Sequence, residues 1–201
     1  EILEQVGISF LFAPAHHAAT KHAGGPRKEL GVRTLFNVLG PLTNPAGAKR
    51  QVMGVYAKSL VAPLAAVLCD LGAEHAIVVH GADGLDEFSL SGESFVSEVR
   101  DGLVTSYTVT PAEVGLVSAP LSTLIGGDAA DNAKILRSIF AGEAGAPSDA
   151  VALNAGAALY VAGEASSLSE GVVIASDLIS SGAAEAKLEE LVLATNAIVE
   201  S

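Results

Sequence analysis

Short apolar runs and helically spaced leucines follow one another in the first half of the chain. The apolar runs predict strands at 51–56 and 75–80, and the leucines predict a helix between them at 60–71, ended by Gly72. A strand, a helix and a second strand at this spacing form a βαβ unit with parallel strands and a right-handed crossover. A further apolar run predicts a strand at 8–13.

Two later segments alternate apolar and polar residues, as strands with one buried face do. Residues 95–100 and 103–109 flank Asp101-Gly102, a two-residue turn sequence, and therefore predict an antiparallel hairpin. Thr110-Pro111, directly after the second segment, is typical of a helix start.

Helical spacing of apolar residues predicts helices near the start of the chain and through its last third. Their approximate ranges are 1–7, 27–38, 128–140, 148–162, 169–181 and 183–199. The second helix is expected to be broken by the sequence Gly40-Pro41-Leu42-Thr43-Asn44-Pro45. The pattern predicts one α/β domain over 1–201, with a mostly parallel sheet, a β-hairpin and flanking helices.

Composition limits the classes of function. The chain has 201 residues, half of them hydrophobic, and a net charge of −12, which argues against a nucleic-acid partner. A phosphorylated metabolite remains compatible with this charge, because a bound Mg²⁺ can reverse the local field. No apolar run of membrane-spanning length and no signal sequence occurs, and the lone Cys69 allows no internal disulfide. We expect a cytoplasmic protein without a membrane partner.

Two adjacent carboxylates follow the apolar strand that ends at Gly81. Asp86 and Glu87 lie in a glycine-containing loop just past the carboxyl end of this strand, where open α/β sheets bind ligands. Such a pair suits Mg²⁺, which takes one or two carboxylates together with water and substrate phosphates. The alternative is a solvated turn, since acidic residues are mostly exposed in any case. His80 could line the same site or be an ordinary hydrogen-bonded residue.

The remaining polar candidates are less specific. Arg27 opens a helix after a Gly-Gly-Pro sequence and could hold a carboxylate bidentately, or lie on the surface. His16 and His17 lack a third ligand at zinc spacing, although His17 could line a substrate pocket. Residues 126–128 match no phosphate-binding fingerprint and indicate a helix start. Without a nucleophile motif, the chemistry favoured is positioning of substrates and stabilisation of charge.

Four segments carry a resemblance to a known family. They are Phe12-Ala13-Pro14 with His17, residues 27–45 (RKELGVRTLFNVLGPLTNP), residues 79–87 (VHGADGLDE) and residues 154–160 (NAGAALY). Together they resemble the anthranilate phosphoribosyltransferases of tryptophan biosynthesis, and the segment 27–45 is the most specific. The resemblance implies the large domain of the nucleoside phosphorylase/phosphoribosyltransferase-type fold.

The resemblance also implies a reaction and roles for individual residues. These enzymes transfer the phosphoribosyl group of phosphoribosyl pyrophosphate (PRPP) to the amine of anthranilate and release pyrophosphate. By resemblance, Asp86 and Glu87 coordinate Mg²⁺ on the pyrophosphate, and Arg27 holds the anthranilate carboxylate. His17 and Pro41 would line the anthranilate path. No residue of the chain is assigned as a general acid or base.

Two departures from the family pattern affect these expectations. Ala18 follows His17 where the family usually has proline, and the family's amino-terminal part, with its Gly-Thr-Gly-Gly-Asp loop, does not occur. The chain also starts within a helix and without Met, so we expect an incomplete fragment that by itself binds PRPP poorly and turns over little. Residues 27–45 are expected to pack with the small helical domain that is missing, through which a full-length protein would form a homodimer.

Three alternatives remain at the level of sequence. A pyrimidine-nucleoside-phosphorylase-like enzyme of the same fold would use phosphate, but the segment 27–45 and the Asp-Glu pair argue against it. A non-catalytic relative that binds nucleic acid is disfavoured by the net charge of −12. A truncated gene product without activity of its own is the third.

Overall fold

The structure, a computed structural model, describes residues 1–10, 36–44 and 46–199. It forms two compact units, Glu1–Ala48 with Lys187–Ser201, and Lys49–Ala186. The first unit contains α1 (Ile2–Val6), α4 (Phe36–Leu42) and most of α9 (Ala183–Val199). The second contains the sheet and the candidate carboxylates. The prediction of one domain over 1–201 stays a prediction.

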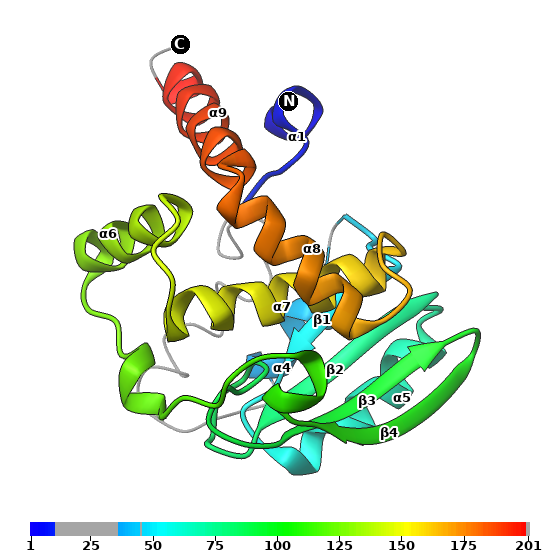
Figure 1. Cartoon of the computed structure of the whole chain (residues 1–201). Helices are drawn as coiled ribbons and strands as arrows, with labels where there is room; N and C mark the ends of the chain where they lie inside the picture. Colours follow the sequence, from blue (N-terminus) through cyan, green and yellow to red (C-terminus); the bar gives the residue numbers. More distant parts are fainter. Residues whose placement is uncertain (11–35, 45, 200–201) are drawn as a thin grey trace, which may run out of the picture. The chain divides into compact units, whose positions relative to one another are not determined.

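The second unit is built on a four-stranded sheet in the order β1-β2-β3-β4 (Figure 1). Its strands are β1 (Arg50–Gly54), β2 (His75–Gly81), β3 (Ser94–Arg100) and β4 (Leu103–Val109). The pair β1–β2 is parallel, and the chain crosses between these strands through η2 (Lys58–Leu60) and α5 (Val61–Asp70). The predicted βαβ unit is therefore confirmed.

The predicted predominance of parallel strands is corrected: the sheet is mixed. β2–β3 and β3–β4 are both antiparallel, which leaves β1–β2 as the parallel pair among the described strands. Parallel neighbours need a crossover of a dozen or more residues, usually helical. The connection from β2 to β3 contains no helix, so β3 returns beside β2 in the opposite direction and brings the predicted β-hairpin with it.

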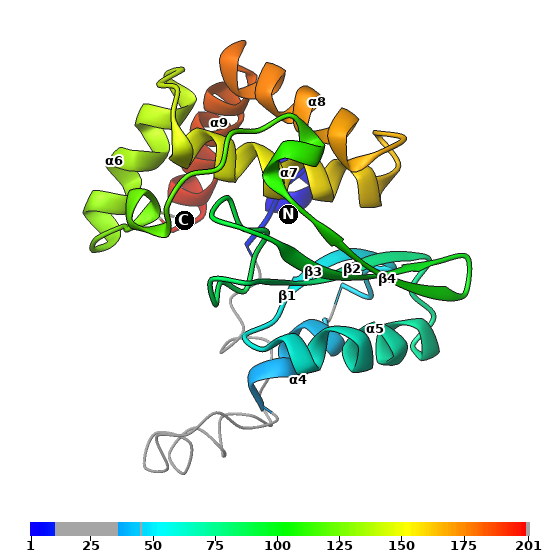
Figure 2. The same cartoon turned by 60° about the horizontal axis from the view of Figure 1, so that its bottom comes forward.

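Helices cover both faces of this sheet (Figure 2). On one face, Ile77 and Val79 pack in a core cluster with Leu153 and Ala157 of α7 (Ala146–Ala162). The opposite face of β2 is covered by α5. Every residue of β2 is buried, as expected for a strand covered on both sides.

Two further helices complete the unit, α6 (Ala129–Phe140) and α8 (Leu168–Ser180). The axes of α7 and α8 approach closely because Gly156 and Gly171 lie against each other. A Cβ on Gly156 would be 2.5 Å from the backbone N of Val172, and a Cβ on Gly171 would be 2.3 Å from Gly156 O. Larger residues at either position would force the two helices apart.

Local start and stop sequences act as predicted. Asp101 and Gly102 form the hairpin turn with φ of 52° and 76°. Asp128 accepts hydrogen bonds from the backbone N–H groups of Ala130 and Asp131, so residues 126–128 are confirmed as a helix start. The start predicted at Thr110-Pro111 is the capping box of η3 (Pro111–Val114), and a second short turn, η4 (Leu121–Leu124), follows.

Two predicted elements differ from the structure. Residues 8–10 of the strand expected at 8–13 are not in a strand, and 11–13 lie outside the described residues. The helix predicted to reach about residue 38 continues as α4 through Gly40 and Pro41 and ends at Leu42, within the segment 40–45 that is expected to break it. Proline keeps a helical φ, and both the N–H and the hydroxyl of Thr43 donate to Leu39 O at the helix end. Across the described ranges, no helix is long and apolar enough to cross a membrane.

Candidate metal and substrate site

The loop that follows β2 presents Asp86 and Glu87. A tight turn opens it, in which Gly81 N–H donates to Leu85 O and Gly84 N–H donates to Gly81 O, both at 2.9 Å. Gly84 adopts φ of 96°, a left-handed conformation that favours glycine. The turn places the two carboxylates directly beyond the carboxyl end of β2, as the sequence predicts.

Asp83 braces this loop from within. Its Oδ2 accepts hydrogen bonds from the hydroxyls of Ser89 and Ser91, both at 2.6 Å, and its Oδ1 accepts one from Leu85 N–H at 3.2 Å. Burial alone would raise the pKa of the Asp83 carboxyl, but these hydrogen bonds outweigh burial and lower the pKa below its usual value. Asp83 is therefore an ionised residue whose oxygens are engaged inside the loop.

Gly54, the last residue of β1, lets the loop approach the sheet. A Cβ at this position would lie 1.5 Å from the backbone oxygen of Asp86 and 2.6 Å from its carbonyl carbon. Only a residue without a side chain permits this contact. The contact sets how closely the Asp86 backbone approaches the end of β1.

Asn154 of α7 holds the next part of the loop. Its Oδ1 accepts a hydrogen bond from Phe88 N–H at 3.0 Å, and its Nδ2 donates to Phe88 O at 3.4 Å. The Phe88 side chain is 1% exposed and belongs to the core beneath α7. The residue after Glu87 is thus fixed through both its backbone and its side chain.

The two candidate carboxylates themselves remain open. Asp86 and Glu87 are exposed, and no hydrogen bond or ion pair from the described residues reaches either carboxylate. Partial burial raises the pKa of the Glu87 carboxyl, and the negative charge of Asp86 raises it further. A cation bound between the two groups would relieve this repulsion.

The donor set fits Mg²⁺ but not a metal held by protein side chains alone. Across residues 1–10, 36–44 and 46–199, no group of three or more His, Cys, Asp or Glu side chains could hold an ion. Two carboxylates with water and phosphate oxygens are the usual surroundings of Mg²⁺ at a phosphate substrate. The pair therefore suits a metal that arrives with a phosphorylated ligand.

The other predicted site residues are less completely described. Arg27 and His17 lie outside the described residues. Pro41 lies in α4 and is exposed. His80 is buried, and its Nδ1–H donates to Val55 O at 2.8 Å. This bond fixes the orientation of the His80 ring, and a role of His80 in lining the site stays a prediction.

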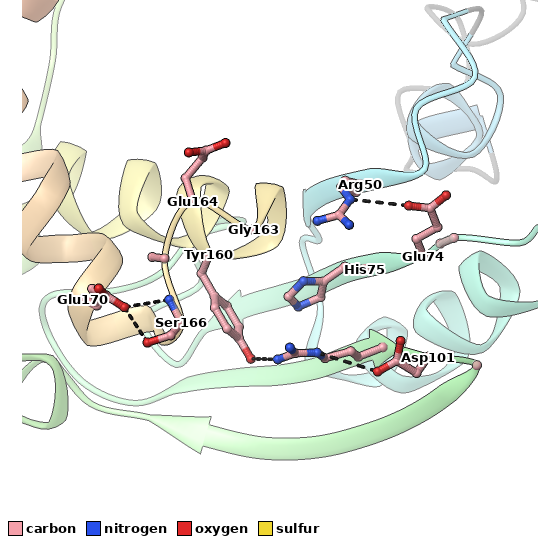
Figure 3. A pocket seen from close by; sticks show the side chains of 13 residues that line it. Arg50, Glu74, His75, Asp101, Tyr160, Gly163, Glu164, Ser166 and Glu170 are labelled. Atoms are coloured by element: carbon pink, nitrogen blue, oxygen red, sulfur yellow. Dashed lines mark hydrogen bonds and ion pairs between the residues drawn. The ribbon is translucent and has the colours of Figure 1, made fainter.

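A separate cavity of about 830 Å³ lies at the opposite end of β2, beside His75. Arg100 donates a hydrogen bond to the hydroxyl of Tyr160 at 3.2 Å. Figure 3 shows Arg50 beside Glu74, with which it forms an ion pair. These cavity-lining groups largely satisfy one another, unlike the open carboxylate pair.

Glu98 lies next to the cavity-lining residues His75 and Tyr160. It accepts three hydrogen bonds of 2.8 Å, from His75 Nε2–H and from the hydroxyls of Tyr107 and Tyr160. Burial alone would raise the pKa of the Glu98 carboxyl, but these bonds outweigh burial and lower the pKa. The network ties β2, β3, β4 and α7 together, and we interpret it as structural.

Comparison with known protein families identifies the family to which this chain belongs. The sequence model described as "Glycosyl transferase family, a/b domain" matches residues 1–185. The chain belongs to this glycosyltransferase family.

Individual relatives within this glycosyltransferase family agree with the resemblance inferred from the residues. The chain is 50% identical over 200 residues to the anthranilate phosphoribosyltransferase of Halorhodospira halophila, covering 100% of this chain and 58% of that protein. The crystal structure of the Thermus thermophilus enzyme of this name aligns with a TM-score of 0.88 at 49% identity, covering 95% of this chain and 56% of that one.

A third relative was solved with ligands. The anthranilate phosphoribosyltransferase from Saccharomyces cerevisiae in complex with PRPP and Mg aligns with a TM-score of 0.76 at 30% identity. The alignment covers 87% of this chain and 51% of that one. The chain thus spans a little more than half the length of these relatives. The resemblance to anthranilate phosphoribosyltransferases is confirmed.

Sequence reasoning missed the residues that support the pair. Gly54 was not singled out, and Asp83 and Asn154 entered only as parts of the segments that carry the family resemblance. Asn154 lies in an Ala-rich helix interior, where asparagine is unfavourable unless its side chain finds partners. That misfit is a local indication that Asn154 has a specific role.

Proposed function

We propose that the protein containing this chain transfers the phosphoribosyl group of PRPP to anthranilate. The bond between the ribose C1 and pyrophosphate breaks, and C1 bonds to the amine nitrogen, which loses one proton. The observation that carries the proposal is the open carboxylate pair Asp86–Glu87, fixed at the carboxyl end of β2. Its support comes from 50% identity to an anthranilate phosphoribosyltransferase across the whole chain.

In this proposal Asp86 and Glu87 hold Mg²⁺ on the pyrophosphate group. When bound, the metal neutralises charge on the leaving pyrophosphate. The two carboxylates supply hard oxygen ligands, and the braced loop keeps them at one place relative to the strand end. The related yeast enzyme solved with PRPP and Mg supports this assignment.

The acceptor side of the proposal rests on Arg27, His17 and Pro41. Arg27 would bind the anthranilate carboxylate with its planar guanidinium and so aim the amine at the ribose. His17 and Pro41 would line the path of the acceptor. Residues 27–45 would pack with a small helical domain, and pairing of two such domains would give a homodimer. The cytoplasmic location expected from the sequence stays a prediction.

The test is an assay of the natural full-length protein with PRPP and Mg²⁺, following anthranilate by its fluorescence. We expect anthranilate to be consumed and Asp86→Asn to lower kcat/KM. Arg27→Ala should raise the KM for anthranilate because it removes the partner of the substrate carboxylate. Wild-type kinetics in either variant would refute the corresponding role.

A second assay separates the runner-up function. With a pyrimidine nucleoside and inorganic phosphate, the proposed enzyme should show no phosphorolysis. Phosphorolysis without anthranilate consumption would overturn the proposal in favour of a nucleoside phosphorylase of the same fold.

A further inference from the structure

Asn154 makes an unusually complete set of hydrogen bonds for a residue in a helix interior. The Oδ1 atom accepts from Phe88 N–H at 3.0 Å, and Nδ2 donates to Ala150 O at 3.0 Å and to Phe88 O at 3.4 Å. The amide thereby pairs with both backbone polar groups of a single residue 66 positions away. The third bond, to the preceding turn of α7, fixes the orientation of the amide itself.

The residue held in this way directly follows Glu87. Its ring is 1% exposed and shares the core cluster with Leu153 and Ala157, the neighbours of Asn154 along α7. Within the pair, the Asp86 carbonyl lies against Gly54 of β1. The carboxylate pair is therefore held between a contact with the sheet and a contact with α7.

Neither candidate carboxylate is fixed by a bond of its own among the described residues. The position of the Glu87 carboxylate therefore depends on the backbone on either side of it. Loss of the Asn154 amide would leave Phe88 N–H and O without these partners and would loosen the residue next to the ligand. Groups that orient metal ligands without touching the metal commonly change metal affinity about 10–100-fold when they are mutated.

We propose that Asn154 is a positioning residue for the Asp86–Glu87 pair, acting through the backbone of Phe88. The proposal rests on the proposed function, because it assumes that the pair holds a divalent cation with pyrophosphate. It extends the site to helix α7 and makes the geometry of the metal ligands dependent on one amide.

The test measures Mn²⁺ binding in the presence of inorganic pyrophosphate, by electron paramagnetic resonance of free Mn²⁺, in the natural full-length protein. Asn154→Ala should weaken Mn²⁺ about tenfold. Asn154→Ser is the second variant, for use if the alanine protein does not fold. Val161→Ala is the matched control, because Val161 is 2% exposed on the same helix and makes no side-chain hydrogen bond.

Three results decide the matter. The proposal holds if Asn154→Ala, or Asn154→Ser, weakens Mn²⁺ and excess Mg²⁺ restores most of the anthranilate turnover, while Val161→Ala loses stability without losing Mn²⁺ affinity. Wild-type Mn²⁺ affinity in a folded Asn154 variant would overturn it, as would an equal loss in Val161→Ala.

Asp86→Asn with Glu87→Gln separates the two levels of the argument. If this double variant also binds Mn²⁺ as the wild type does, the metal assignment itself fails. If it loses Mn²⁺ and Asn154→Ala does not, only the positioning role fails.

Discussion

Gly54→Ala is expected to displace the carboxylate pair without removing a charge. A Cβ at Gly54 would lie 1.5 Å from Asp86 O, whereas ordinary contact begins at 3.4 Å. The close-packed interior leaves little room for adjustment, so the Asp86 backbone has to retreat by about 2 Å. The obstacle is backbone rather than a flexible side chain, so the shift passes directly to the residues that follow.

The size of the effect follows from this displacement. A misplacement of about 1 Å can lower a rate about a hundredfold, so we expect at least that loss in anthranilate turnover. Overpacking at the strand end should also lower the free energy of unfolding by about 1–3 kcal/mol. Turnover is measured across a Mg²⁺ titration at a temperature below that at which the variant melts. Thermal unfolding is followed separately by circular dichroism.

Gly92→Ala, in the loop that carries Asp86 and Glu87, provides the matched control. A Cβ at Gly92 would meet nothing within 4 Å, and Gly92 does not have a positive φ. This variant should keep wild-type turnover and stability. If folded Gly54→Ala also kept wild-type turnover and Mg²⁺ dependence, the contact between β1 and Asp86 would not control the position of the pair.

Three further changes test the fold around the site. Glu98 has a lowered pKa, so its ionised form contributes stability at neutral pH that is lost as pH falls through that pKa. Urea unfolding at several pH values should show a lower free energy of unfolding for Glu98→Gln than for wild type at pH 7, and this difference should narrow below about pH 4.5. A difference that stays constant with pH would contradict this role of Glu98. Gly156→Ala should cost about 1–3 kcal/mol in thermal unfolding, because its Cβ would lie 2.5 Å from Val172 N, and an unchanged melting temperature would refute the close helix contact. Asp128→Ala should cost about 1 kcal/mol by removing the cap of α6, with little effect on turnover.

The elements predicted best are those set by neighbouring residues. Asp101-Gly102 requires positive φ at two adjacent positions, which few sequences other than a hairpin turn provide. Helix ends at Gly7, Asp128 and Gly163 follow from capping by a single side chain or by a left-handed glycine.

The direction of β3 relative to β2 could not be predicted from the pattern of buried residues. Val96 and Val99 indicate which residues of β3 are buried, but burial is the same whether a strand runs parallel or antiparallel to its neighbour. The direction follows from the connection between β2 and β3, which has no crossover helix.

The candidate site could be predicted in its exposed part but not in its support. Asp86 and Glu87 stand out because they follow a buried strand. Asn154 is 66 positions from Phe88, and the contact of Gly54 with Asp86 joins two different strand ends. Neither relation leaves a periodicity or a motif, because both arise only when the chain has folded.

The central claim is that Asp86 and Glu87 bind PRPP through a cation. Its most direct test is the PRPP dissociation constant, measured by calorimetry with and without Mg²⁺, for wild type and for the Asp86→Asn, Glu87→Gln double variant. We predict that Mg²⁺ tightens PRPP binding to wild type and that the double variant loses this effect, with affinity at least about tenfold weaker. If the pair were only a solvated turn, removal of two negative charges would leave PRPP binding unchanged or tighten it, and that result would contradict the account.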